Sequence, residues 1–248
     1  MGATERFQRL ELKYHLTDVV AERVRRAAAP WCVPDRHNPS GGGGYPISSL
    51  YLDSPGLEFH KARARGDADR IKLRIRTYGA AQDAHLEIKR KVGKIVHKHR
   101  VAVPRVQAAD IARGRGGTGE AVERFQLLAG RYGAIPKVTV FYEREAWVST
   151  VDDYARITFD RRIRARAASD WTLHTSPPPD AHPLDRPHLP DAVSSSVVLE
   201  LKCVTLVPRW IRQLIADFEL VSTGFSKYSN AVEHCGLGPQ QSQPVWRT

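Results

Sequence analysis

The chain has 248 residues, a formal net charge of +11 and an isoelectric point near 9.8, and 42% of its residues are apolar. No apolar run approaches the roughly 20 residues that a membrane-spanning helix needs, and the amino terminus lacks the apolar segment of a secretion signal. Three widely spaced cysteines exclude a disulfide framework and a zinc motif. We therefore expect a cytoplasmic protein with an apolar core. Its basic charge predicts an anionic partner, and nucleic acid, anionic lipid and polyphosphate all fit the charge.

The first predicted elements are two strands, each followed by a helix. Alternation of apolar and polar residues predicts a strand over residues 9–16. Thr17 is the expected N-cap of a helix that Pro30 ends. A second strand is expected over 47–53, followed by a helix over 55–66 with proline at its first position.

The densest alternation lies in residues 70–100, which predict three strands and a hairpin turn at 92–94. One face of the first of these strands is aliphatic and the other is basic, with Lys72, Arg74 and Arg76. A solvated face usually mixes acids and bases, because like charges repel one another across strands. The excess of cations therefore favours a surface that binds a polyanion, such as a chain of phosphates.

The rest of the chain continues the mixture of strands and helices. We expect helices over 106–113, 120–131, 208–220 and from Ser226 onward, and strands over 137–151, 156–163 and 197–205. In the strand 156–163, alternation places Ile157, Phe159 and Ile163 on one face. Residues 174–194 are expected to form a mobile loop and 239–248 a disordered tail. Residues 1–238 show no domain boundary and are expected to form one domain.

Nearly every predicted strand has one basic face and one aliphatic face. An open sheet with helices on its apolar face fits this pattern, and so does a closed barrel with a charged interior. With about eight strands, such a barrel holds only side chains and a narrow ligand. The fold class we expect is α+β, with a closed antiparallel eight-stranded β-barrel and helices packed on its outside.

Short motifs along residues 9–235 resemble the VTC domain, which is the catalytic domain of the vacuolar transporter chaperone complex and of its bacterial relatives, within the triphosphate tunnel metalloenzyme superfamily. In order, they are KY at 13–14, SLYLD at 49–53, RIRTYG at 74–79, EIK at 87–89, KHR at 98–100, YER at 142–144, LELK at 199–202 and FSKY at 225–228. The resemblance implies a β-barrel tunnel. It also implies polyphosphate synthesis, in which the γ-phosphate of ATP moves to a growing chain and ADP leaves, with Mn²⁺ or Mg²⁺ bound.

The resemblance also implies which residues form the site. The residues expected to act in catalysis are Arg74, Arg76, Lys89, Arg144 and Lys227. Those expected to bind substrate are Lys13, Lys98, Arg100, Tyr142, Arg156, Lys202 and Ser226. Glu200 matches the metal-binding glutamate of the family, and Glu11 and Glu87 are expected to face the same interior and to assist. Arginine forks and lysine ammonium groups are suited to phosphate oxygens, and a hard divalent ion needs carboxylate and phosphate oxygens.

Simpler roles stay open for several of these residues. Glu87 and Glu200 could serve only as partners of neighbouring cations, Tyr142 could pack the barrel, and Ser226 could cap a helix. The cations expected at the rim or on the surface are Lys72, Lys91, Arg162 and Arg164.

Two other functions stay open besides the polymerase. The first is an inorganic triphosphatase or polyphosphate hydrolase of the same fold. The second is a non-catalytic module that binds polyphosphate or nucleotide and docks to a membrane partner. ATP and polyphosphate are the expected ligands, with a separate membrane protein if polymer is exported. Nucleic acid is not expected, because no exposed aromatics or groove-reading helix accompany the charge.

Overall fold

The computed structural model describes residues 9–40, 43–93, 95–152, 154–185, 196–204 and 206–238, so the expected tail at 239–248 lies outside the described residues. In chain order the elements are β1 (Arg9–Thr17), α1 (Asp18–Ala28), β2 (Cys32–Pro34), β3 (Tyr45–Asp53), α2 (Glu58–Ala64), β4 (Asp69–Tyr78), β5 (Asp83–Val92), β6 (Ile95–Pro104), a 3₁₀ turn (Arg105–Gln107), α3 (Ala108–Ala112), α4 (Glu120–Arg131), β7 (Ile135–Ser149), β8 (Ala155–Ala167), β9 (His182–Pro183), β10 (Ser196–Val204), α5 (Arg209–Asp217) and α6 (Lys227–His234).

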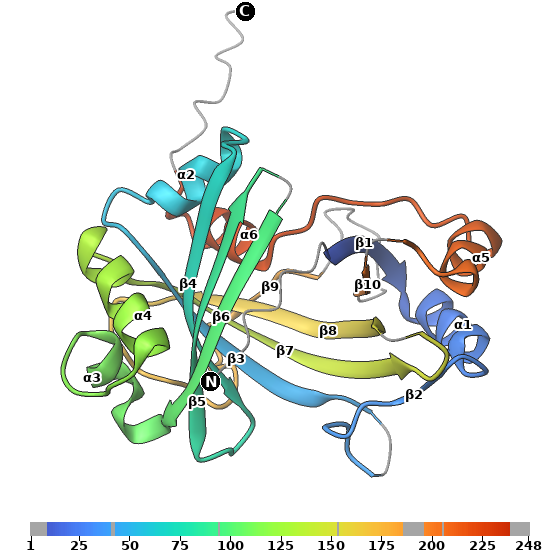
Figure 1. Ribbon diagram of the computed structural model, residues 1–248, viewed down its shortest axis with the longest axis horizontal. Helices are drawn as coiled ribbons and strands as arrows, with labels where there is room; N and C mark the ends of the chain where they lie inside the picture. The colour runs from blue at the N-terminus through green and yellow to red at the C-terminus, as the bar shows by residue number, and fades with distance from the viewer. Residues whose placement is uncertain are drawn as a thin grey trace, which may run out of the picture.

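One antiparallel sheet forms the body of the structure (Figure 1). Its strands pair in the order β1-β10-β8-β7-β3-β4-β5-β6, while the short strands β2 and β9 pair with β7 and β8. The α+β class and the antiparallel pairing are as predicted, and the eight predicted strands are the eight on this path.

The predicted closure of the sheet into a barrel is wrong. In the described part of the chain no ladder joins β1 to β6, so these two strands end the sheet. The segment before α6 lies along β1 instead, and the Thr223 amide donates to the Lys13 carbonyl at 2.8 Å. An ion pair spans the gap, because Glu11 Oε2 on β1 lies 3.1 Å from Lys89 Nζ on β5. The curved sheet is therefore tunnel-like but stays open along one seam.

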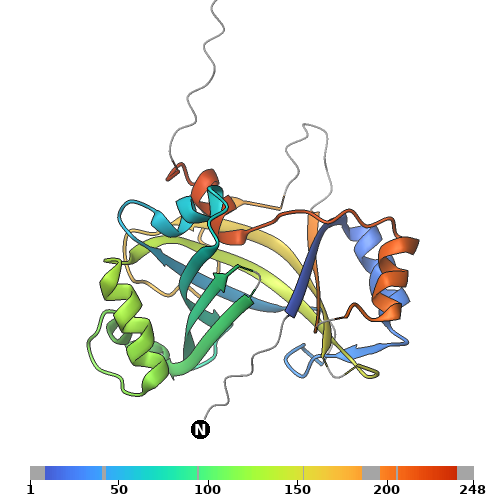
Figure 2. The same cartoon turned by 45° about the horizontal axis from the view of Figure 1, so that its top comes forward.

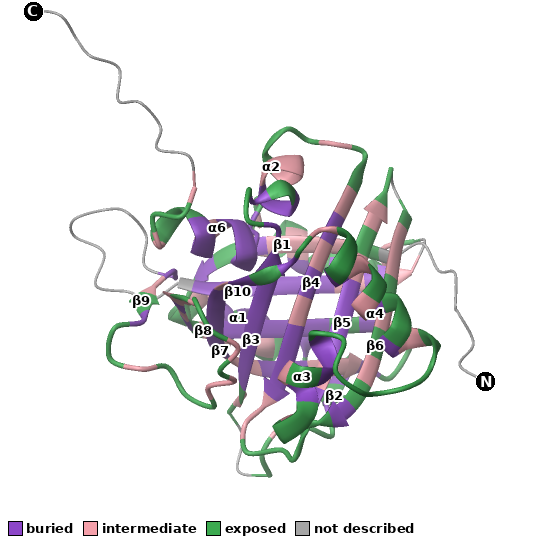
Figure 3. Cartoon of the chain, turned by 90° about the vertical axis from the view of Figure 1, so that its left-hand side faces the viewer, coloured by how far each residue is buried: buried purple, intermediate pink, exposed green. Residues whose placement is uncertain are grey.

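Helices cover the apolar outer face of the sheet near its two ends (Figures 1 and 2). At one end α1 and α5 pack on β1, β8 and β10, in a core that includes Val24, Phe159 and Trp210. At the other end α3 and α4 pack on β4 and β5, in a core that includes Leu86 and Phe125. Figure 3 shows that burial is concentrated in the central strands and in α6. We call the opposite, polar side of the sheet, which carries Lys13, Arg74, Arg144 and Glu200, the inner face.

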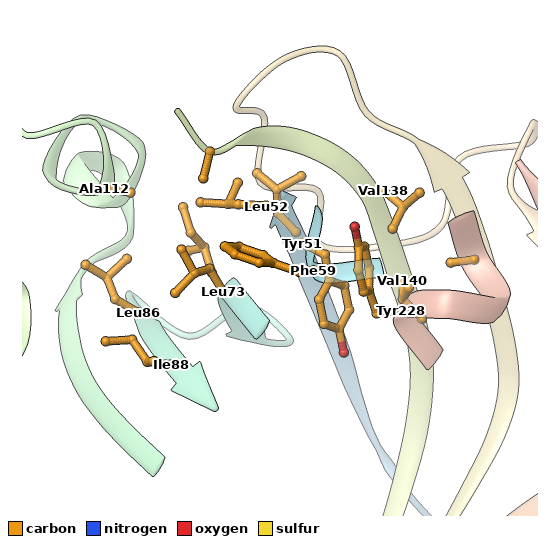
Figure 4. Close-up of a cluster of buried hydrophobic side chains, with 14 of the residues drawn as sticks. Tyr51, Leu52, Phe59, Leu73, Leu86, Ile88, Ala112, Val138, Val140 and Tyr228 are labelled. Carbon is orange, nitrogen blue, oxygen red and sulfur yellow. The ribbon is translucent and has the colours of Figure 1, made fainter. Parts of the chain in front are cut away.

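Helix α6 closes part of the inner face and is anchored by Asp53. This fully buried carboxylate accepts hydrogen bonds from the Phe59 and His60 amides of α2 and from the Tyr228 hydroxyl of α6. The Tyr228 ring stacks on Tyr51, with centroids 5.1 Å apart (Figure 4). Because Tyr228 follows Lys227 directly, this anchor fixes where the Lys227 ammonium enters the inner face.

Several local predictions can be compared with the structure. The Thr17 cap is confirmed, because its Oγ1 accepts from the Val20 amide at 3.3 Å, and the helix at 120–131 is confirmed as α4. The predicted helix over 55–66 begins only at Glu58. The chain first makes a turn, in which the Leu57 amide bonds to the Ser54 carbonyl and Leu57 takes a left-handed conformation.

The segment expected to be a mobile loop has some regular structure. Its part at 182–183 forms β9 on β8, and the Leu184 amide donates to the Ile163 carbonyl at 2.7 Å. Residues 186–195 lie outside the described part of the chain. Among the described residues, the longest helices are too short and too polar to span a bilayer.

The Asp53 anchor generates a stability prediction. Replacing Asp53 with Asn keeps one acceptor oxygen but turns the other into a donor that faces amide and hydroxyl donors. We expect D53N to lower the free energy of unfolding by about 2–4 kcal/mol in urea denaturation. The control is D67N. The Asp67 carboxylate pairs with Arg65 at the exposed surface, and this pair should contribute less than about 1 kcal/mol to the free energy of unfolding. Equal stabilities of D53N and D67N would contradict the anchor.

Candidate functional site: a basic inner face with buried counter-ions

The inner face gathers cations from six strands and from α6. Pairing in register places Arg74 opposite Glu87, Glu87 opposite Arg100, and Lys13 opposite Glu200. Side chains that lie opposite one another in an antiparallel ladder point to the same side of the sheet. The alternation read from the sequence thus produces one continuous basic surface, and its carboxylates divide it into two clusters.

The first group, which we call the Glu87 cluster, consists of Glu87 with Arg74, Arg76, Lys98 and Arg100. Glu87 is 2% exposed and accepts a hydrogen bond from Arg74 Nε at 2.7 Å. Its other oxygen lies 3.6 Å from Lys98 Nζ and 3.5 Å from Arg100 Nε. Burial alone would raise the pKa of Glu87, but the surrounding cations, Arg74 above all, hold it well below its usual range. Glu87 is therefore ionised and serves as the counter-ion of this cluster.

The second group, the Asp160 cluster, consists of Asp160 and Glu200 with Lys13, Arg144, Lys202 and Lys227. Arg144 donates from Nε and Nη2 to both oxygens of Asp160, at 2.6 and 2.7 Å, and Lys227 Nζ donates to Asp160 at 2.5 Å. Glu200 is 4% exposed. Its oxygens lie 2.8 Å from Lys202 Nζ and 3.4 Å from both Lys13 Nζ and Arg144 Nη2.

The pKa shifts in the Asp160 cluster have the same cause as the pKa shift of Glu87. Burial would raise the pKa values of Asp160 and Glu200, but neighbouring cations lower both. The two carboxylates in turn raise the pKa of Lys227 against the effect of its burial. Asp160, Glu200 and Lys227 are consequently charged at neutral pH, as members of a buried ion pair must be to hold one another.

The Tyr142 ring joins the two clusters. Its centroid lies 5.9 Å from the Arg76 guanidinium carbon, 5.3 Å from that of Arg144 and 4.8 Å from Lys227 Nζ. A tyrosine ring attracts cations to its face, so this buried side chain holds three of the predicted catalytic cations around one point. Packing and a role in the site are compatible for Tyr142.

The structure places every predicted site residue on the inner face or at its edge. Arg156 is peripheral, since its side chain is 46% exposed and its nearest carboxylate, on Asp35, is 3.9 Å away. Ser226 caps α6, because its Oγ accepts from the Ser229 amide at 3.3 Å, and it also accepts from Lys72 at 3.0 Å. Arg162 is a surface residue as predicted, 73% exposed and paired with Glu143.

Two residues of the inner face were missed or misplaced by sequence reasoning. Asp160 was not predicted as a site residue, although it alternates with Arg156 and Thr158 on the polar face of β8. The prediction of a rim position for Lys72 is wrong. As the alternation predicted, Lys72 shares its face with Arg74 and Arg76, and it is half-buried there, where its Nζ donates to Ser226 Oγ.

The carboxylates of the inner face are not equally suited to bind a metal ion. Among the described residues, no three metal-ligating side chains are grouped to hold one. Glu11 and Glu200 come close together, because one oxygen of each contacts Lys13 Nζ, at 3.0 and 3.4 Å. Glu87 lies apart from this pair, enclosed by the cations of its own cluster. The pair fits a hard divalent ion that takes its remaining ligands from phosphate oxygens and water.

Comparison with known proteins identifies the family of the chain. The model of the VTC domain matches residues 8–235. A Bacillus halodurans protein proposed to be an adenylate cyclase shares the fold, with a TM-score of 0.53 and 11% identity over 94% of this chain and 98% of that one. A Hippeastrum protein, proposed to be an adenylyl cyclase and described as having a dominant triphosphatase activity, aligns with a TM-score of 0.45 and 13% identity over 90% of this chain and 95% of that one. No curated protein sequence matches this chain.

The Glu87 cluster generates a prediction about pH. Burial and the nearby arginines lower the pKa of Lys98 to about 7, against the effect of Glu87. Above that pH, binding of a phosphate chain must restore a proton to Lys98. The affinity for tripolyphosphate should therefore fall as pH rises above 7, by at most about tenfold per pH unit. In K98R the cation stays charged, so this part of the slope should disappear in calorimetric titrations. Identical slopes in both proteins would contradict a binding role for Lys98.

Proposed function

Because the chain belongs to the VTC-domain family, we propose that it is a metal-dependent polyphosphate polymerase that uses ATP. In the proposed reaction a terminal oxygen of the polyphosphate chain attacks the γ-phosphorus of ATP. The bond between the γ-phosphorus and the β–γ bridging oxygen breaks, the chain grows by one phosphate, and ADP leaves. Arg74, Arg76, Arg144 and Lys227 would neutralise the charge of the transferred phosphoryl group, and Lys13, Lys98, Arg100 and Lys202 would hold the flanking phosphates.

The observation that carries this proposal is the state of the buried carboxylates. Glu87, Asp160 and Glu200 each contact at least two cations, and their pKa values are depressed. Transfer between two ionised phosphates needs no proton acceptor, since the charges of ATP and chain equal those of ADP and the longer chain. Hydrolysis, in contrast, must remove a proton from water. A site rich in cations, whose acids are poor bases, therefore suits transfer to phosphate better than transfer to water.

The metal ion of the proposal would lie at Glu11 and Glu200. When bound there, Mn²⁺ or Mg²⁺ would supply further charge neutralisation to the phosphate oxygens. Lys13 already contacts both glutamates, so its ammonium would move toward phosphate when the ion arrives. Asp160 would hold Arg144 and Lys227 until phosphate oxygens replace it, and Tyr142 would keep both cations oriented during transfer.

A product assay tests the proposal. Purified protein incubated with ATP and Mn²⁺ or Mg²⁺ should release ADP and an equal amount of phosphate as polymer. Arg76→Ala should lower the rate by at least about a hundredfold, because the guanidinium contributes charge stabilisation that is strongest in the transition state. The control is Arg26→Ala. The Arg26 side chain on α1 is 75% exposed, so its removal should not change the rate.

Each other product pattern points to a different function. Orthophosphate as the only product besides ADP would identify a hydrolase. Tight binding of polyphosphate without turnover of ATP in the presence of either metal would identify a binding module. Either result would contradict the polymerase.

A further inference from the structure

A cavity of about 260 Å³ lies between α2 and α6, which pack side by side (Figures 1 and 2). Within the described part of the chain, its lining consists of His60, Arg63 and Ala64 of α2 and of Ser229 and Glu233 of α6. This lining includes no residue of the Glu87 cluster or of the Asp160 cluster. The cavity is therefore separate from the basic inner face, and the proposed polymerase reaction does not use it.

Two polar side chains of the lining are buried and unsatisfied. His60 and Ser229 are each 5% exposed, and His60 Nδ1 and Ser229 Oγ have no hydrogen-bond partner among the described residues. A buried polar atom without a partner is costly, and most such atoms in folded proteins have one. A ring nitrogen of histidine and a serine hydroxyl can each donate to a ligand or accept from it. These two atoms indicate that the cavity takes a polar ligand.

The charged residues of the lining carry opposite signs and come from different helices. Arg63 on α2 is half-buried, and its Nη2 donates to the Gly224 carbonyl at 3.0 Å. Burial and the charge of Arg70 lower the pKa of Arg63, whereas the carboxylate of Glu233 on α6 raises it, so the two charges act on each other. No ion pair joins these two described side chains, although both line the cavity. A positive group and a negative group thus face one cavity from its two walls.

The ligand that suits this lining carries a charge of each sign. An anionic group fits the guanidinium of Arg63, with the hydroxyl of Ser229 and the imidazole of His60 as further donors. An ammonium group fits the carboxylate of Glu233. The cavity is smaller than the roughly 300–1,000 Å³ of sites for drug-sized ligands, and its remaining lining residue is Ala64. The ligand is therefore a compact molecule with a short side chain.

We propose that the cavity between α2 and α6 binds a small zwitterion of the α-amino acid class, such as glycine, alanine or serine. Its carboxylate contacts Arg63, Ser229 and His60, and its ammonium group contacts Glu233. The bound ligand links the two helices that Asp53 already joins, and so it stabilises the docking of α6. This inference is independent of the proposed function, because the site needs neither ATP nor polyphosphate.

Thermal melting and calorimetric titration of the purified protein test the site. The probes are glycine, L-alanine and L-serine, and acetate and methylammonium at equal concentration and ionic strength are the controls that carry one charge each. Glu233→Gln removes the negative charge and keeps the size of the side chain. The matched control is Glu123→Gln, because Glu123 is an exposed glutamate on a different helix, α4. Ser229→Ala removes the unsatisfied hydroxyl.

We expect at least one of the three amino acids, in excess, to raise the melting temperature of the wild type by about 2–4 °C. Acetate and methylammonium should each produce less than half of that shift, and saturating tripolyphosphate should leave it unchanged. E233Q should bind the same amino acid at least about tenfold more weakly than the wild type, and E123Q should bind it equally well. S229A should also bind it more weakly, yet without ligand it should melt no lower than the wild type, because it loses no hydrogen bond.

Four results would overturn the site. If none of the amino acids raises the melting temperature of the wild type, the cavity takes up only water. If acetate acts as strongly as the best amino acid, or if E233Q binds that amino acid as E123Q does, the cavity does not recognise a zwitterion. If tripolyphosphate abolishes the shift, the amino acid binds on the inner face. All four leave the proposed polymerase standing, because the product assay tests it separately.

Discussion

The structure depends on the neutralisation of the many cations that the sheet carries on its inner face. Like charges at this density repel one another, and burial weakens the screening by water. Three buried carboxylates make the arrangement possible. Glu87 holds the guanidinium of Arg74, Asp160 holds Arg144 and Lys227, and Glu200 lies among the lysines of β1 and β10. Their depressed pKa values show how strongly the cations favour the ionised form.

The apolar outer face provides the rigidity that the inner face needs. Two separate cores, one under α1 and α5 and the other under α3 and α4, hold the strands in register while the polar side chains converge. Helix α6 contributes from the other side, because Asp53 and Tyr228 fix the point at which Lys227 enters. Within the described residues no ladder joins β1 to β6, so the ion pair of Glu11 and Lys89 spans a seam that the strands there do not close.

Strands and faces were predictable from the sequence because a strand has a period of two residues. That period placed Lys72, Arg74 and Arg76 together on one face, as the register of β4 with β5 has them. It fails where the backbone departs from regularity. Arg162 takes a left-handed conformation at a bulge in β8. Ile163 therefore joins the core cluster that also contains Tyr228 and Val232 of α6, whereas Ile157 and Phe159, predicted on its face, join the other core.

Whether the sheet closes and which buried charges pair were less predictable, because both depend on contacts between segments that are distant in the sequence. The edge of β1 meets Thr223, 210 residues later in the chain, and no local pattern in residues 9–17 indicates this. Asp160 was recognisable as a polar-face residue of β8. Its position between Arg144 and Lys227 follows only from the β7–β8 register and from the docking of α6.

The central claim is that these carboxylates stand in for substrate phosphates and yield the cations to them. Unfolding of Asp160→Asn in urea, with and without tripolyphosphate, tests this claim most directly. Without ligand, D160N should be about 3–5 kcal/mol less stable than the wild type, because Arg144 and Lys227 lose their buried counter-ion. At saturating tripolyphosphate the deficit should shrink to less than about 2 kcal/mol, because the phosphates replace the lost charge. A deficit that stays the same at every tripolyphosphate concentration would contradict the account.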